Sequence, residues 1–156
     1  MLGAMLVFVP LAPGDLAAWA SGTPYSGDAF AATPAFLSAF GLTSPDDEDA
    51  DLTLLEIAAL AGLLRHGVRL VAVADAAGPP ATPADLGAIT IADTRWSQVQ
   101  SLFADDADGA AQAASVRAEL GEVGLTQAWD AEPTASLLAD GELLWHGSTE
   151  WERLSH

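Results

Sequence analysis

Residues 44–75 read SPDDEDADLTLLEIAALAGLLRHGVRLVAVAD, and this stretch carries the clearest signals of local structure in the chain. Leucine and alanine recur at helical spacing within it, which predicts an amphipathic helix over 44–66. Two basic residues end this segment and Gly67 follows, as is typical of a helix C-terminus. The apolar run 68–75 predicts a buried strand directly afterwards. A long helix leading into a buried strand indicates a sheet with helices packed on it.

The rest of the chain contains further segments of both kinds. Apolar or alternating runs predict strands at 5–11, 28–32, 88–92 and 97–104, and capping patterns predict helices at 13–20, 34–41 and 106–120. Long helices separate some of these strands, and tight turns join others. The expected fold class is therefore α/β, with α+β as the alternative. We expect a single globular domain over residues 1–156, with a mixed β-sheet of about five to seven short strands and helices packed on it.

Two connections bear on the order of the strands. Asp93–Trp96 has the composition of a tight turn and would join its neighbouring strands as an antiparallel hairpin. Asp140-Gly141 lies between the apolar runs 136–139 and 142–145, and Asp-Gly in that position is a strong hairpin signal. The hairpin is expected here, and a helix that starts at Pro133 and ends at the glycine is the competing interpretation.

The composition excludes several functional classes. The chain has 22 acidic and 5 basic residues, for a formal net charge of −17, and no cysteine. Because such a surface repels phosphate groups, neither nucleic acid nor an anionic membrane is an expected partner. The apolar N-terminal stretch lacks basic residues and contains Pro10 and Asp15, so it does not match a signal peptide. No stretch approaches the roughly 20 apolar residues of a membrane span. A soluble cytoplasmic protein is expected.

Residues 99–111, VQSLFADDADGAA, place three aspartates where an expected strand ends and a helix begins. Carboxylates at a helix N-terminus accept hydrogen bonds from free amides and interact favourably with the helix dipole. Capping therefore accounts for at least two of Asp105, Asp106 and Asp108, and the alternatives are a metal or catalytic role and a contact with a partner. An EF-hand is excluded, because the twelfth position counted from Asp106 is Arg117, where that loop requires glutamate.

A metal site would form if the ends of two strands converged. Asp75 and Asp105 each end an expected strand. The hairpin expected at 93–96, together with an antiparallel connection from the 68–75 strand, would bring those two ends to the same end of the sheet. The hypothesis is that Asp75, Asp105 and Asp106 cluster and bind Mg²⁺ or Ca²⁺ through carboxylates and water. Without such a cluster no cofactor is expected.

The acidic run 46–51, DDEDAD, is longer than a helix cap needs. A solvated helix start is the simpler interpretation, because attraction to the helix dipole offsets the repulsion between like charges. The functional interpretation is a docking patch for a basic partner.

Tryptophan is frequent, with five in 156 residues. Trp129, Trp145 and Trp151 lie near the C-terminus, and Arg153 stands close to the last of them. Tryptophan and arginine are favoured anchors of protein interfaces. These four residues are therefore the candidates for a partner-binding or dimer surface, and closing the core is the alternative role of the tryptophans.

No residue is assigned as catalytic. The chain lacks Gly-x-Ser-x-Gly, His-Glu-x-x-His, and the glycine-rich motifs that bind phosphate or dinucleotides. His146 has Glu150 nearby in the sequence, which is the composition of an acid–base pair, but no motif places a nucleophile beside them.

The chain resembles a family of small, acidic, uncharacterised actinobacterial proteins. The resemblance is carried by MLVFVPL at 5–11, Thr33-Pro34-Ala35, RLVAVAD at 69–75, VQSLFADD at 99–106 and GELLWH at 141–146. Asp105-Asp106 and Glu142–Trp145 match best, whereas His146 stands in place of an aromatic residue. The resemblance runs across most of the chain, implies an intracellular single domain, and carries no established activity.

These observations predict a non-enzymatic interaction or regulatory module that binds protein and self-associates, as a homodimer, through its C-terminal aromatic segment. The alternative is a small metal-dependent enzyme or divalent-cation-binding protein that uses the clustered aspartates.

Overall fold

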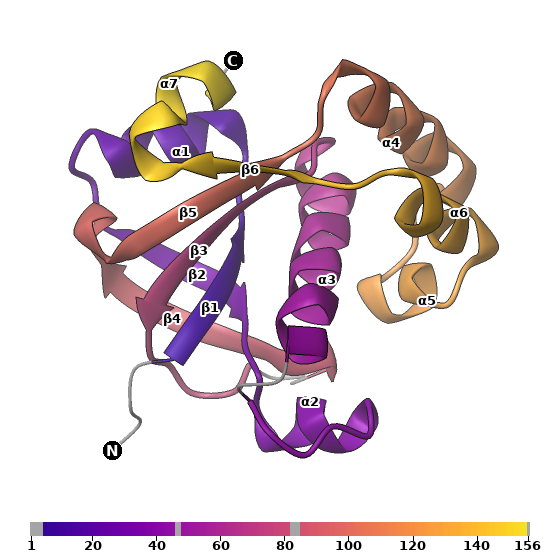
Figure 1. Ribbon diagram of the computed structural model, residues 1–156, viewed down its shortest axis with the longest axis horizontal. Coiled ribbons are helices and arrows are strands. Elements are labelled where there is room, and N and C mark those ends of the chain that lie inside the picture. Colours follow the sequence, from indigo (N-terminus) through magenta and orange to yellow (C-terminus); the bar gives the residue numbers. More distant parts are fainter. Residues whose placement is uncertain (1–4, 46–47, 82–84, 156) are drawn as a thin grey trace.

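A six-stranded antiparallel sheet organises the computed structural model, which describes residues 5–45, 48–81 and 85–155 (Figure 1). The strands are β1 (Met5–Pro10), β2 (Tyr25–Phe30), β3 (Leu70–Ala76), β4 (Ala88–Thr94), β5 (Val99–Ala104) and β6 (Leu144–Gly147). Their order in the sheet is β4-β2-β1-β3-β5-β6. The α/β class and the number of strands are confirmed. Every pairing between these strands is antiparallel, so the expected mixture of strand directions is absent from them.

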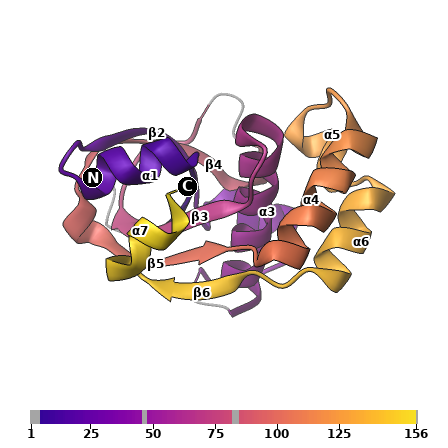
Figure 2. The same cartoon turned by 90° about the horizontal axis from the view of Figure 1, so that it is seen from above.

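Helices cover both faces of the sheet and add a further layer (Figures 1 and 2). They are α1 (Pro13–Ala20), α2 (Pro34–Ala39), α3 (Glu48–His66), α4 (Ala107–Leu120), α5 (Leu125–Trp129), α6 (Glu132–Asp140) and α7 (Trp151–Leu154), with 3-10 turns η1 (Asp85–Gly87), η2 (Trp96–Gln98) and η3 (Ser148–Glu150). Helix α3 packs on one face, α1 and α7 lie on the other, and α4 to α6 pack against the outer side of α3 (Figure 2). Among the helices of the described residues, none has both the length and the hydropathy needed to span a bilayer.

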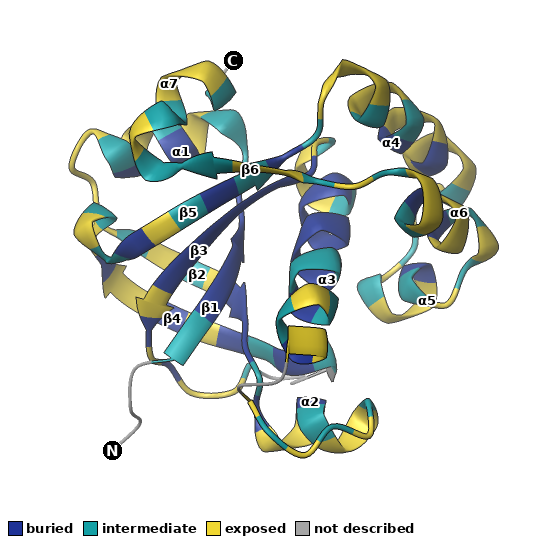
Figure 3. Cartoon of the chain, in the orientation of Figure 1, coloured by how far each residue is buried: buried dark blue, intermediate teal, exposed yellow. Residues whose placement is uncertain are grey.

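Helix α3 is buried on two sides because it separates the sheet from the outer helices. Every residue from Ile57 to Leu63 is buried, whereas the first turns alternate between exposed positions such as Glu48 and Leu52 and buried ones such as Ala50 and Leu54 (Figure 3). A Cβ at Gly62 would lie 3.1 Å from the carbonyl oxygen of Val68, so the small residue lets α3 approach the start of β3 closely. Apolar residues all round a helix are the pattern of a buried helix, which explains why this segment gives the strongest sequence signal.

The sheet is strongly curled, as the short connection between β4 and β5 requires. Three strands lie between these two, which in a flat sheet would separate them by about 19 Å at ~4.8 Å for each step. The link 95–98 allows at most about 17 Å between its flanking residues. The two strands therefore approach each other through the curl, and Ile91 of β4 shares a core cluster with Val99 of β5. The hairpin expected at this turn is wrong, because β4 pairs with β2 and β5 pairs with β3.

The hairpin expected around Asp140-Gly141 is also wrong, and the competing helix is correct. Helix α6 has Pro133 in its first turn, and the amide of Gly141 donates to the carbonyl of Leu137 at 2.7 Å where the helix ends. Burial decides between the two interpretations. Thr134 and Leu137, three positions apart, face inward together, and the Thr134 hydroxyl donates to the carbonyl of Ala128 at 2.6 Å.

Trp19 of α1 closes the curled part of the core. Its indole Nε1 donates to the carbonyl oxygen of Thr94, at the end of β4, at 2.9 Å. The ring centroid lies 5.1 Å from that of Tyr25 and 5.6 Å from that of Trp96. Both Trp19 and Thr94 are buried. The indole therefore satisfies a carbonyl group at the point where the chain crosses from one end of the sheet to the other.

Replacing Trp19 with phenylalanine should lower the free energy of unfolding by about 1–3 kcal/mol, because the buried carbonyl of Thr94 loses the hydrogen bond from the indole. Urea unfolding followed by circular dichroism measures this loss. Trp151→Phe removes the same ring atoms from a half-buried position and should cost less. Equal losses for the two variants would show that the hydrogen bond contributes nothing beyond packing.

Candidate functional site

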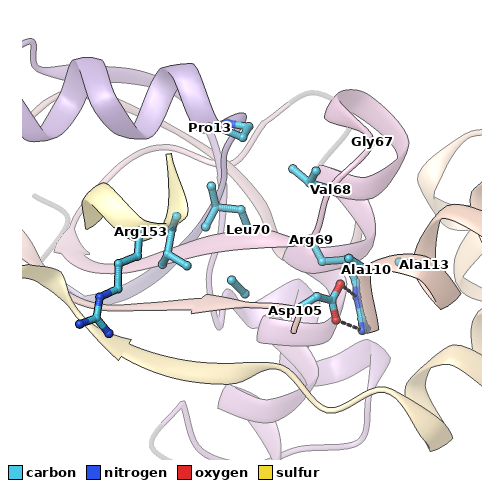
Figure 4. A pocket seen from close by; sticks show the side chains of 11 residues that line it. Pro13, Gly67, Val68, Arg69, Leu70, Asp105, Ala110, Ala113 and Arg153 are labelled. Atoms are coloured by element: carbon cyan, nitrogen blue, oxygen red, sulfur yellow. Dashed lines mark hydrogen bonds and ion pairs between the residues drawn. The ribbon is translucent and has the colours of Figure 1, made fainter. Parts of the chain in front are cut away.

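A buried ion pair joins Arg69, which directly precedes β3, to Asp105, which directly follows β5. The guanidinium Nε donates to Oδ2 of Asp105 at 2.8 Å, and the terminal nitrogen Nη2 donates to Oδ1 at 2.5 Å. The two side chains are only 2% and 5% exposed, and Figure 4 shows them facing each other. The same Nη2 also donates to the carbonyl of Gly141 at 3.3 Å. One guanidinium therefore connects β3, the β5–α4 junction and the segment that leads to β6.

Strand register, a helix cap and two glycines position the side chains of Arg69 and Asp105. Pairing of Leu70 with Ala104 sets the preceding arginine beside the following aspartate. Asp106 is the N-cap of α4, and its Oδ1 accepts from the amide of Gly109 at 2.7 Å. A Cβ at Gly109 would lie 2.5 Å from Oδ1 of Asp105, and one at Gly141 would lie 2.8 Å from Nη2 of Arg69. Both positions therefore require glycine for the backbone to pass this close to the pair.

A small cavity lies on one side of the ion pair. It has a volume of about 200 Å³, and α7 contributes Arg153 and Leu154 to its wall. In Figure 4 the side chain of Arg153 extends away from the pair, and 78% of that side chain is exposed. Because the carboxylate of Asp105 is already engaged by Arg69, this cavity offers a ligand mainly apolar contacts.

A larger groove lies on the other side of the pair, between α3 and the segment that joins α6 to β6. Figure 1 shows this segment crossing in front of α3. The groove has a volume of about 480 Å³, within the range of roughly 300–1,000 Å³ seen for ligand pockets. Its walls include Leu52, Leu55, Glu56, Phe103, Leu138 and Leu143, with Arg69 also contributing. We call this feature the α3–β6 groove.

Glu56 is the acidic side chain that α3 presents to the α3–β6 groove. Burial raises the pKa of the Glu56 carboxyl above its ordinary value, and the nearby Arg69 guanidinium opposes this shift. Because burial dominates, the charged carboxylate lacks full solvation in the folded protein. A positively charged group beside Glu56 would favour its ionised form.

Strand β6 forms one edge of the sheet, and Figure 3 shows its course across the front of the molecule. Trp145 is 64% exposed although its register partner is Phe103, which lines the groove. Directly paired residues lie on the same face of a sheet, so the indole of Trp145 is on the α3 side, next to the groove. Leu52, on the α3 wall of the groove, is 56% exposed. Leu144 is 46% exposed on the opposite face of the sheet, since its register partner Ala104 belongs to the core cluster that contains Trp19. The groove and the β6 edge together form an apolar surface open to solvent.

The structure does not form the expected cluster of Asp75, Asp105 and Asp106. The hypothesis assumed a β4–β5 hairpin, but β5 pairs directly with β3 and runs in the opposite direction. Asp75 therefore lies six residues along β3 from Arg69, the residue level with Asp105, which is about 20 Å at ~3.3 Å per residue. Its carboxylate instead accepts from Gln100 at 2.5 Å. No group of three or more His, Cys, Asp or Glu side chains able to hold a metal ion occurs within 5–45, 48–81 and 85–155.

The four candidate interface residues have different surroundings. Trp129 packs edge-on against Phe40 with ring centroids 6.2 Å apart, and Trp151 packs half-buried against the core cluster that contains Trp19. Trp145 presents its ring to solvent, and Arg153 lies 3.5 Å from Glu150 on the surface. Of the tryptophans expected to bind a partner, Trp145 is thus the one with an exposed ring.

Two residues that matter here were not singled out by the sequence patterns. Arg69 is a charged residue inside the apolar run 68–75, and Glu56 interrupts the leucine-rich α3. Charged residues are almost never fully buried without a partner, so an arginine in a buried strand was itself a signal. The sequence gives no means of identifying its partner, because Asp105 lies 36 positions away.

Replacing Asp105 with alanine should lower the free energy of unfolding by about 3–5 kcal/mol, because it leaves the Arg69 guanidinium buried without a counter-charge. Urea unfolding measures this loss. The double variant Arg69→Met/Asp105→Leu should recover much of it, since neither charge remains. Asp108→Ala, an exposed acid in the same turn, should change stability by at most about 1 kcal/mol. Equal effects of Asp105→Ala and Asp108→Ala would contradict this role for the pair.

Comparison with known proteins identifies the family but no activity. Residues 5–154 match the model of a family of unknown function (DUF6912). No curated protein and no solved structure matches the chain. The matched range runs from β1 to α7 and includes the ion pair, the α3–β6 groove and the β6 edge. The chain belongs to this uncharacterised family, DUF6912.

Proposed function

We propose that the protein is a non-enzymatic protein-interaction module that self-associates through the outer edge of β6. The observation that supports this most directly is the exposed ring of Trp145 on an edge strand. Edge strands present unpaired amide and carbonyl groups, and soluble proteins usually protect them with lysine, proline, bulges or a covering segment. Strand β6 reads Leu-Trp-His-Gly and contains no proline.

The other edge of the sheet provides a comparison. Residues 79–81 run along the outer side of β4: Thr90 donates to the carbonyl of Pro79 and Ala81 donates to the carbonyl of Ala88, each at 3.0 Å. Within the described residues, no strand pairs with the outer side of β6. The chain itself therefore covers the first part of the β4 edge, whereas no described strand covers the outer side of β6, which leaves room there for a second copy.

A two-fold axis perpendicular to the sheet would pair two β6 strands antiparallel. Such an interface is self-complementary, because each copy contributes the same patch. Both Trp145 rings would then lie on the same face of the joined sheet, close to the axis. Tryptophan is enriched among the residues that contribute most to binding. Because of the two-fold symmetry, each copy would contribute its Trp145 ring to the same interface.

The net charge determines how this association depends on salt. Each copy carries a formal charge of −17, so two copies repel each other at low ionic strength. The screening length falls from about 30 Å at 0.01 M salt to about 8 Å at 0.15 M. Because strand pairing and tryptophan contacts do not need charge, screening removes the opposing force and leaves the attraction. Self-association should therefore strengthen as salt is added.

Replacing Trp145 with alanine should raise the dissociation constant of the dimer at least about 30-fold, the equivalent of a 2 kcal/mol anchor residue. Analytical ultracentrifugation across protein concentration measures this, and the wild-type dimer should tighten between about 0.02 M and 0.5 M NaCl. Val68→Ser, at an exposed apolar position two residues before β3, is the matched control. A wild-type chain that stays monomeric at high salt and high concentration would refute self-association.

A further inference from the structure

The α3–β6 groove has an apolar floor and an acidic rim. Leucines from α3 and from the segment before β6 form its walls, together with Phe103. Glu56 points into it from α3, and Asp140 and Glu142 line its opposite side. Glu48 lies on the same stripe of α3, eight positions before Glu56 and so close to two helical turns away. The groove therefore combines apolar surface with carboxylates contributed by two different segments.

The burial and the hydrogen bonds of Arg69 determine which sign of charge this groove favours in a ligand. Its guanidinium is 2% exposed and donates to both oxygens of Asp105 and to the carbonyl of Gly141. An anionic ligand would have to displace the Asp105 carboxylate from the Arg69 guanidinium. This would leave the Asp105 charge buried without a partner, at a high cost in free energy. Glu56, by contrast, is half-buried and accessible from the groove. A cationic group is the ligand that the groove favours.

The apolar walls narrow the ligand further. A bare cation would leave the leucines and Phe103 in contact with water, whereas a ligand with apolar side chains would bury them. A groove of about 480 Å³ can hold a few side chains of a peptide. We infer that the α3–β6 groove binds a basic, amphipathic segment of another protein, with leucine-like side chains on its floor and a lysine or arginine at Glu56.

This inference also gives a role to the acidic run 46–51. Asp46 and Asp47 lie outside the described residues, and Glu48 begins α3 four positions before the groove residue Leu52. Acidic residues beside the groove increase the rate at which a basic segment is captured, and salt weakens that attraction. All groove residues belong to one chain, so a monomer can bind the segment. Failure of self-association would leave the inference standing.

The test uses the full chain and a fluorescently labelled hexapeptide of alternating leucine and lysine. Fluorescence polarisation at low salt should show saturable binding that weakens as NaCl is added. A hexapeptide of alternating serine and lysine carries the same charge and should bind at least about tenfold more weakly, because it buries no apolar surface. A hexapeptide of alternating leucine and glutamate should not bind. Equal binding of the leucine–lysine and serine–lysine peptides would overturn the inference.

Two variants locate the site. Glu56→Gln should weaken binding of the leucine–lysine peptide at least about tenfold, the usual effect of losing a hydrogen bond to a charged group. Glu119→Gln, on the exposed surface of α4, changes the net charge by the same amount and should alter binding less than about twofold. Equal effects would show that the peptide binds the overall negative charge and would overturn the assignment of the groove.

Folding of the variants can be checked independently. Burial raises the pKa of Glu56, so its ionised form is disfavoured in the folded state, and a neutral glutamine should fold at least as well at neutral pH. Leu52→Ser changes a side chain that is 56% exposed at the groove and should also weaken peptide binding without loss of the fold. Peptide binding unchanged by Leu52→Ser would contradict the proposed contact with the apolar wall.

Discussion

The Arg69–Asp105 ion pair is the constraint on which the arrangement of the candidate site depends. Two buried charges lose their hydration, and only close geometry with further hydrogen bonds compensates for that loss. Here the compensation comes from two hydrogen bonds between the side chains and a third to the carbonyl of Gly141. That third bond fixes the segment between α6 and β6. The position of this segment defines one wall of the groove and the start of the exposed edge strand.

Local rules predicted most of the elements but not their arrangement. Thr33 and Asp106 cap α2 and α4 as their sequence positions indicate, and Gly67 follows the end of α3. These features depend on neighbours within one turn. Strand order depends instead on which apolar faces meet, and the Asp93–Trp96 turn looked like a hairpin although the chain there crosses a curled sheet. The hairpin signal at Asp140-Gly141 was similarly outweighed by burial of the α6 face.

Sequence patterns also predicted only part of the candidate site. The sequence identifies tryptophans near the C-terminus as interface candidates, but their exposure is set by elements far away in the chain. Phe40 partly covers Trp129, and the core cluster that contains Trp19 partly covers Trp151. Trp145 stays exposed because β6 is the last strand of the sheet. The pairing of Asp105 likewise follows from the β3–β5 register, which no pattern within either strand encodes.

Charge and apolar surface act in opposite directions at the two neighbouring binding surfaces. At the β6 edge a second copy brings the same negative charge, so the apolar contact must overcome repulsion that salt reduces. In the groove a basic segment brings opposite charge, so salt reduces the attraction. Phe103 lines the groove and pairs with Trp145 on the edge, which makes the two surfaces adjacent on the same face of the sheet. Low ionic strength therefore favours the basic segment and high ionic strength favours the second copy, so a salt titration of each distinguishes these occupants by the sign of the response.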